Sequence, residues 1–210
     1  MAKKLKVGVI GLGSMGSTHL DIYSLISEVE VVAIADPNKS RLDGSSKAEG
    51  NISGQAQGSV SGLEAKQYLD GMDLIDDPDI ELVDICVGTN LHFVFVEAAL
   101  AKGKHVLVEK PIAQSTTEAN QMIRAYRENK VVLHVGQSER FNPALLAVKP
   151  FISEPCFFES HRLGVFVSRS LDIDVVLDLM IHDLDLILHF VKSPLRKIYA
   201  VGIPVLSSRV

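Results

Sequence analysis

The chain has 210 residues, of which 47% are hydrophobic and 22% are charged. This is the composition of an ordinary globular protein, with enough apolar residues for one good core or for one domain and part of another. The formal net charge is −5 and the lysines and arginines are scattered along the chain, which argues against a nucleic-acid partner.

The N-terminal segment carries positive charges but lacks the long apolar region and the cleavage site of a signal peptide. No uninterrupted apolar stretch approaches the length of a membrane span. We therefore expect a cytoplasmic protein with no membrane partner. Cys86 and Cys156 lie in apolar runs without the spacing of a metal site, so we expect two buried thiols and neither a disulfide nor a metal.

Up to about residue 137, apolar strands alternate with amphipathic helices. This alternation is typical of a parallel sheet with crossover helices, so we predict a doubly wound, Rossmann-type α/β domain over residues 1–137. The expected strands are 6–10, 31–35, 82–87, 105–108 and 131–135. The expected helices are 15–26, 92–101 and 116–128, the last with Ser115 as N-cap and Glu118 three residues on.

The first expected strand runs directly into the pattern G-x-G-x-x-G, formed by Gly11, Gly13 and Gly16. Gly11 lets the chain turn tightly off the strand, Gly13 lets backbone N–H groups approach a pyrophosphate, and Gly16 lets the helix pack close to the sheet. The helix that begins near Ser14 and Met15 directs its positive end at the phosphates. Because a strand precedes the motif and a helix follows it, we predict a bound dinucleotide.

The next expected strand ends at Asp36, about twenty residues beyond the third glycine. A carboxylate here accepts hydrogen bonds from both hydroxyls of an adenosine ribose, which favours NAD. Arg41 is able to contact a 2′-phosphate, so NADP stays an alternative. The other positions we expect for Arg41 are over the adenine or in solvent.

Two segments break the alternation of strands and helices. Residues 44–62 are rich in Gly, Ser and Gln and predict a loop or a mobile helix remnant. After residue 143 we expect strands at 156–161, 164–167 and 197–201 and a long apolar helix at 174–191. This order predicts a second, incomplete α+β domain over residues 138–210, whose open sheet edge needs more sequence or another chain to cover it.

Polar residues follow two of the expected strands at the carboxyl edge of the sheet, where ligands bind in open α/β folds. Thr89, Asn90 and His92 follow the strand 82–87, where the alternatives are helix capping alone and capping combined with cofactor contact. Glu109 and Lys110 follow the strand 105–108. Pro111 restricts Lys110 to extended geometry, and the peptide bond between them is a candidate for the cis form. An ordinary exposed turn is the alternative.

Four polar residues recur at spacings of four, three and four along the apolar helix 174–191. They are Asp178, His182, Asp185 and His189. Such a stripe must face something polar, and the cleft between two domains is the expected place. Asp178 and His182 are spaced to hydrogen bond, which would orient the imidazole and raise its pKa. A solvated face, a satisfied Asp–His pair and a metal site are the alternatives, of which the metal site is the weakest.

Several segments together resemble the family of glucose–fructose oxidoreductase, inositol dehydrogenase and MocA-like oxidoreductases. The matching segments are 11–16, 35–37, 89–92, 103–113 and 140–143, together with Asp178 and His182. The Glu109-Lys110-Pro111 run is the most specific of these matches. The chain departs from the family at Gly88, where proline is usual, and in its length, because relatives are commonly much longer.

The resemblance implies an oxidoreductase that transfers a hydride between NAD and a secondary hydroxyl of a sugar, sugar nucleotide or polyol. It implies that Lys110, Asp178 and His182 are catalytic and meet over the nicotinamide, with His182 as the general base. The run 175–183 looks most like members that oxidise the 3-hydroxyl of nucleotide-linked amino sugars. A homodimer or homotetramer is also expected. The alternative functions are a non-catalytic NAD-binding sensor or scaffold, and a sugar-converting enzyme with tightly bound, recycled NAD.

Overall fold

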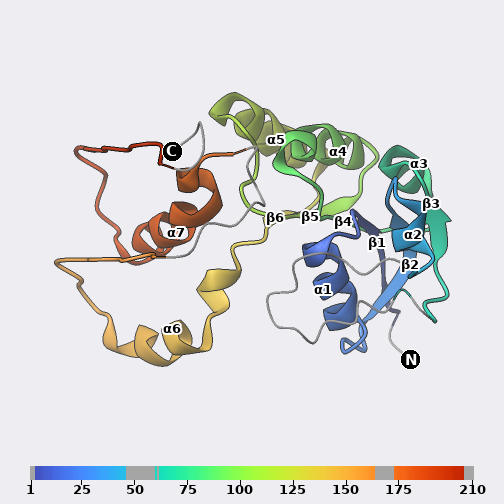
Figure 1. Ribbon diagram of the computed structural model, residues 1–210, viewed down its shortest axis with the longest axis horizontal. Coiled ribbons are helices and arrows are strands. Elements are labelled where there is room, and N and C mark those ends of the chain that lie inside the picture. The colour runs from blue at the N-terminus through green and yellow to red at the C-terminus, as the bar shows by residue number, and fades with distance from the viewer. Residues whose placement is uncertain (1–2, 46–59, 61, 164–172, 206–210) are drawn as a thin grey trace. The chain divides into compact units, whose positions relative to one another are not determined.

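The computed structural model describes residues 3–45, 60, 62–163 and 173–205 (Figure 1). The chain divides into two compact units, Met1–Val135 and Gly136–Val210, and each is described by itself. The strand expected at 164–167 and most of the loop expected at 44–62 lie outside the described residues. Within the described ranges, no helix is both long and apolar enough to cross a bilayer.

The first unit is built on a six-stranded parallel sheet in the order β3-β2-β1-β4-β5-β6. From β1 the chain builds outward through β2 and β3, and then returns to the other side of β1 for β4, β5 and β6 (Figure 1). This is the doubly wound order, with its change of direction between β1 and β4, and it confirms the predicted fold class. The strands are β1 Leu5–Ile10, β2 Val29–Ala35, β3 Lys66–Tyr68, β4 Leu82–Ile85, β5 His105–Val108 and β6 Leu133–Val135.

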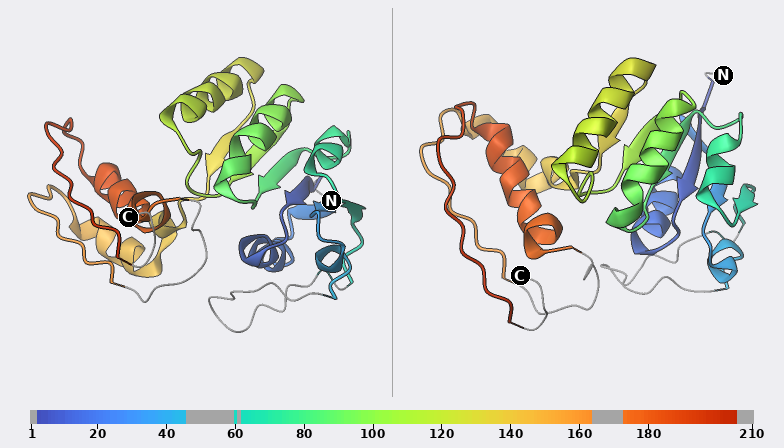
Figure 2. Two further views of the ribbon diagram at one scale, coloured as in Figure 1. Left: turned by 45° about the horizontal axis from the view of Figure 1, so that its top comes forward. Right: turned by 90° about the horizontal axis from the view of Figure 1, so that it is seen from above.

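Helices cover both faces of this sheet (Figure 2). They are α1 Ser14–Tyr23, α2 Lys39–Leu42, α3 Gly71–Asp76, α4 Thr89–Ala101 and α5 Thr116–Asn129. Residues of α1 and α2 belong to one hydrophobic cluster, and those of α3, α4 and α5 to the other. The start of α5 is as expected, since the Ser115 side chain accepts a hydrogen bond from the Glu118 N–H at 3.2 Å.

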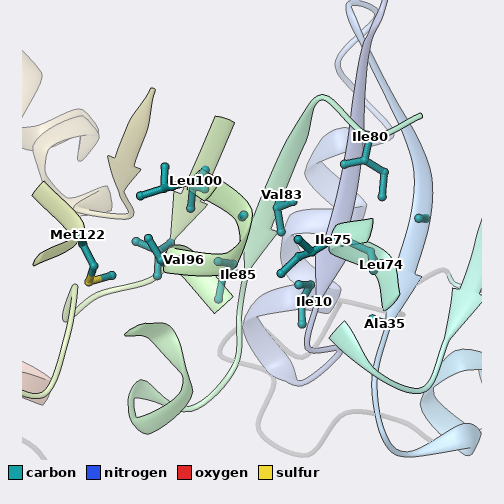
Figure 3. Packing of buried hydrophobic residues seen from close by; sticks show 14 of the residues in the cluster. Ile10, Ala35, Leu74, Ile75, Ile80, Val83, Ile85, Val96, Leu100 and Met122 are labelled. Carbon is teal, nitrogen blue, oxygen red and sulfur yellow. The ribbon is translucent and has the colours of Figure 1, made fainter. Parts of the chain in front are cut away.

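Alternation along the strands divides their side chains between the two clusters. In β1, Val7 and Val9 pack with α1, whereas Ile10 lies in the cluster of α3, α4 and α5. Figure 3 shows this larger cluster, in which Leu74 and Val96 pack toward the strands. Burial of both faces explains why the strands have continuous apolar sequences.

The second unit is helical and irregular where it is described. Its elements are the 3₁₀ turns η1 Ser138–Phe141 and η2 Lys149–Phe151, the helix α6 Pro143–Val148, the π-helical turn η3 Val176–Met180 and the helix α7 Ile181–Phe190. The helix expected at 174–191 is present, but its first part is the π turn. The strands expected at 156–161 and 197–201 are wrong, because both segments are irregular. A strand needs a partner for its backbone groups, and the described part of this unit supplies none.

The two cysteines differ from each other in burial. Cys156 is exposed, contrary to the expectation of a core thiol, because the segment around it does not form the expected strand. Cys86 follows the end of β4 and is half-buried, and both are free thiols.

A buried polar cluster joins the end of α3 to β3 and β5. The Asp77 carboxylate accepts hydrogen bonds from Lys66 Nζ and the Tyr68 hydroxyl, both at 2.9 Å. Buried Lys104, just before β5, donates to the backbone oxygen of Asp77 at 2.7 Å. Burial alone would raise the pKa of Asp77, but the bonds from Lys66, the Asp79 N–H and Tyr68 outweigh it and lower this pKa to about 2.

We expect Asp77 to contribute stability that acid removes. Its folded-state pKa of about 2 lies below the unfolded value near 4, so its contribution is complete at neutral pH and is lost as the pH falls from about 4 to about 2. Asp77→Asn should cost about 1–3 kcal/mol at pH 7 and should flatten the pH dependence in that window. Urea denaturation at a series of pH values measures both effects.

Asp79→Asn is the matched control, because Asp79 contacts the same lysine at 2.9 Å but its side chain is 55% exposed. It should change stability much less than Asp77→Asn. Equal acid sensitivity of the Asp77→Asn variant and the unmodified protein would contradict the assignment.

Candidate functional site

The glycine turn after β1 has one crowded side and one open side. Gly11 has φ +91°, a backbone conformation that favours glycine, and a Cβ on Gly16 would lie 1.9 Å from the Gly11 carbonyl oxygen. A Cβ on Gly13 would meet no described atom within 4 Å. Gly11 and Gly16 are therefore required by the fold itself, whereas the described part of the chain leaves the space beside Gly13 open.

Two helices begin at this edge of the sheet with glycine N-caps, α1 at Gly13 and α4 at Gly88. Neither glycine has a side chain that could accept a hydrogen bond from the first N–H groups of its helix. The positive ends of the two helix dipoles favour an anion at these helix starts. Because β1 and β4 are neighbours, both helices start where the strand order reverses, which is the binding position in this kind of sheet.

The residues around these helix starts have different exposures. Ser14 is half-buried and Met15 is 36% exposed at the start of α1. Thr89 is buried and Asn90 is exposed in the first turn of α4, so they lie inside the helix and do not form its N-cap. Gly88 has φ −63°, the value that proline fixes, so this departure from the family pattern requires no change of backbone.

Asp36 lies at the carboxyl end of β2 and is 2% exposed. Its Oδ2 accepts a hydrogen bond from the Leu12 N–H and its Oδ1 one from the Asn38 N–H, both at 2.8 Å. The carboxylate therefore holds the glycine turn in place. Its Oδ1 keeps a second lone pair for a ligand, whereas Oδ2 also accepts a hydrogen bond from Arg41 Nη1. The Arg41 side chain lies beside this carboxylate and forms an ion pair with it, with Nη1 at 3.4 Å from Asp36 Oδ2.

His92 has a structural position inside α4. It is 1% exposed, and its ring nitrogens lie 2.9 Å from the Pro111 carbonyl oxygen and 3.1 Å from that of Val87. The imidazole thus joins the turn after β4 to the turn after β5, where the Lys110–Pro111 peptide bond is cis. We assign His92 to supporting these turns.

The turn after β5 carries the expected charged pair. Glu109 and Lys110 are both half-buried, and Glu109 Oε2 accepts a hydrogen bond from the Lys110 N–H at 3.2 Å. The other oxygen, Oε1, lies 3.3 Å from Nε2 of His19, a residue of α1 that the sequence analysis did not single out.

His19 belongs to a buried network that extends into the sheet. Its Nδ1 lies 2.8 Å from Oδ2 of Asp84, which also accepts a hydrogen bond from the Tyr23 hydroxyl at 3.0 Å. The sequence signal for this network was Asp84, an acid inside the apolar run of β4. A carboxylate buried in a strand needs polar partners, so its presence indicates a buried polar network.

The other expected catalytic residues belong to the second unit. Asp178 lies in the π-helical turn η3, and His182 is the second residue of α7. Asp185 of the same polar stripe is bound by Arg140 through two hydrogen bonds of 2.7 and 2.6 Å, which join η1 to α7. This part of the stripe is therefore a structural ion pair, and the role of Arg140 was not predicted from the sequence.

Comparison with known proteins agrees with this geometry. The model of the GFO/IDH/MocA family, described as an oxidoreductase family with an NAD-binding Rossmann fold, matches residues 5–137. The chain belongs to this family. The resemblance found in the sequence and the expectation of an NAD-binding fold are thereby confirmed.

Several relatives have named activities. A UDP-N-acetylglucosamine 3-dehydrogenase of Acidithiobacillus ferrooxidans is 32% identical over 98% of this chain and 60% of its own length. A myo-inositol 2-dehydrogenase of Thermotoga maritima is 28% identical over 94% of this chain and 58% of its own length. A solved structure of the Acidithiobacillus enzyme matches with a TM-score of 0.81 and 31% identity, covering 99% of this chain and 63% of the other. The chain thus spans about 60% of the length of these relatives.

The glycine turn predicts opposite outcomes for two alanine substitutions. Gly16→Ala should destabilise the fold by about 1–3 kcal/mol or more, because its methyl group meets the Gly11 carbonyl. Gly13→Ala should lower the melting temperature much less, by the small cost of alanine at an N-cap, but should raise the Kd for NAD by about tenfold or more, because its methyl group fills the open space. Thermal melting and calorimetric titration measure the two effects. A Gly13→Ala variant as destabilised as the Gly16→Ala variant would count against the open side.

Proposed function

We propose that the protein is an NAD-dependent oxidoreductase that acts on a secondary hydroxyl of a sugar, sugar nucleotide or polyol. The observation that carries the proposal is the space that the described residues leave at Gly13, beside the glycine-capped starts of α1 and α4. Membership of an oxidoreductase family and relatives named as dehydrogenases of UDP-N-acetylglucosamine and of inositol support it.

The residues at this edge of the sheet fit a dinucleotide. The first N–H groups of α1 and α4 would bind the pyrophosphate, and Asp36 would accept hydrogen bonds from the adenosine ribose. Thr89, Asn90 and Glu109 would contact the other half of the cofactor. When bound, NAD supplies the hydride-accepting ring, which no amino-acid side chain provides.

The catalytic roles are assigned to three side chains of this chain. His182 would take the proton of the substrate hydroxyl at an imidazole nitrogen, and Asp178 would hold the ring and stabilise its charged form. Lys110 would donate a hydrogen bond to the same substrate oxygen and stabilise the negative charge that develops there. The π-helical turn at Asp178 supports this assignment, because such turns occur frequently at functional sites.

The finer substrate that we propose is a nucleotide-linked amino sugar oxidised at its 3-hydroxyl. The support is the run 175–183 and the 32% identity to a protein named UDP-N-acetylglucosamine 3-dehydrogenase. We also propose that residues 1–137 bind the cofactor and that residues 138–210 contribute to substrate binding and assembly. The homodimer or homotetramer and the cytoplasmic location stay predictions from the sequence.

Asp36 should set the preference for NAD over NADP. Asp36→Asn keeps an oxygen for the Leu12 N–H but removes the charge that repels a 2′-phosphate, and it releases Arg41 from its ion pair. We expect the ratio of the Kd for NADP to that for NAD to fall by about tenfold or more. Calorimetric titration of both cofactors measures this ratio, and an unchanged ratio would remove Asp36 from the ribose site.

His182→Ala should lower turnover of UDP-N-acetylglucosamine or myo-inositol, whichever is the better substrate, by about 100-fold or more, because a general base is lost. The Kd for NAD should stay close to its original value. His189→Ala, on the same helix, is the matched control and should retain most of the activity. Unchanged turnover in the His182→Ala variant would exclude this histidine as the base.

A further inference from the structure

The network around His19 connects three elements of the first unit. His19 and Tyr23 come from α1, Asp84 comes from β4, and Glu109 follows β5. The Asp84 side chain is completely buried, while those of His19 and Glu109 are only 15% and 12% exposed. Two carboxylates therefore approach one imidazole in a place that is largely shielded from water.

The charges in this network follow from its hydrogen bonds. His19 faces Asp84 Oδ2 with Nδ1 at 2.8 Å and Glu109 Oε1 with Nε2 at 3.3 Å. Carboxylate oxygens accept hydrogen bonds, so this geometry fits an imidazolium whose two ring nitrogens donate, and Nδ1 also lies 3.3 Å from Cys86 Sγ. Burial would lower the pKa of His19, but the bonds to Asp84, Cys86 and Glu109 outweigh it and raise this pKa far above its ordinary value.

A metal ion is the competing explanation, because ligand atoms of His19, Asp84 and Cys86 lie within 4.8 Å of one another. Zinc at its usual distances would hold the nitrogen and oxygen ligands about 3.3 Å apart in a tetrahedral site. The observed 2.8 Å from His19 Nδ1 to Asp84 Oδ2 is the distance of a direct hydrogen bond, and the same oxygen accepts from Tyr23. The distances favour hydrogen bonding over a metal.

We propose that His19 is a positioning residue for the nicotinamide ring of the cofactor. Anchored on buried Asp84, it holds the Glu109 carboxylate, which in turn accepts the Lys110 N–H and orders the turn that carries the catalytic lysine. This inference rests on the proposed function. Asp36 follows β2 and Glu109 follows β5, on opposite sides of the reversal between β1 and β4, so the network should leave the adenosine half unaffected.

Comparison of two ligands tests this separation. ADP-ribose contains the adenosine, the pyrophosphate and the second ribose of NAD but lacks the nicotinamide. The His19→Gln substitution removes the positive charge of the ring. The glutamine side chain can donate a hydrogen bond to only one of the two carboxylates. In calorimetric titrations, we expect the Kd of the His19→Gln variant for NAD to rise by about tenfold or more, because charge-assisted contacts are lost. Its Kd for ADP-ribose should stay within about twofold of the original.

His134→Gln is the matched control, since His134 is an exposed histidine of β6 in the same unit, and both of its Kd values should be unchanged. Tyr23→Phe removes only the hydrogen bond from the hydroxyl to Asp84, so it should raise the Kd for NAD by a smaller factor than His19→Gln. This second variant tests the inference even if His19→Gln does not fold. Equal losses for NAD and ADP-ribose, or no loss for either, would overturn the positioning role.

Two further results would also overturn the inference, and they have different consequences for the proposed function. One equivalent of metal in the purified protein, lost in Cys86→Ala but retained in Cys156→Ala, would make His19 a metal ligand and leave the proposed function intact. Failure of the unmodified protein to bind either NAD or ADP-ribose would instead remove the cofactor assignment on which the inference rests.

Discussion

The contact between α1 and the glycine turn is the constraint on which the nucleotide-binding unit depends. With no side chain at Gly16, the helix lies so close to the Gly11 carbonyl that even a methyl group would not fit. This contact places the start of α1 at the end of β1, next to the start of α4 at the end of the neighbouring strand. Asp36 reinforces the arrangement from β2 through its bond to the Leu12 N–H. The open space at Gly13 is a consequence of this packing.

Buried polar groups then join the turns of the sheet to one another. His92 connects the turns after β4 and β5, and Lys104 fixes the end of α3 against the start of β5. The His19 network does the same between α1 and the turn after β5. In each case a side chain satisfies groups that would otherwise be buried without partners, so these bonds make the geometry of the edge specific. Motif residues such as His92 and Lys104 thus support the binding edge from inside the fold.

Most of the first unit was predictable from the sequence because its long elements have clear periodicity. The strand β3, of three residues, and the helices α2 and α3, of four and six residues, are too short for periodicity to identify. The equally short β6 was predicted because it lies in the apolar run 131–135. The role of Asp84 was not predicted, because a single acid does not change the assignment of the apolar run around it as a strand. The strands expected in the second unit failed for another reason, since strand propensity has no effect without a partner strand. The proposed meeting of Lys110 with Asp178 and His182 stays a prediction, because local sequence patterns do not encode how separate units pack.

The irregular segment after α7 has a practical consequence for work with this chain. Its apolar side chains are largely exposed, including Leu195 at 68%, Tyr199 at 81% and Val201 at 96%. An extended run rich in β-branched and aromatic residues is prone to self-association at high concentration. Crystallisation and storage of the chain should therefore begin at low concentration, with light scattering to detect aggregates.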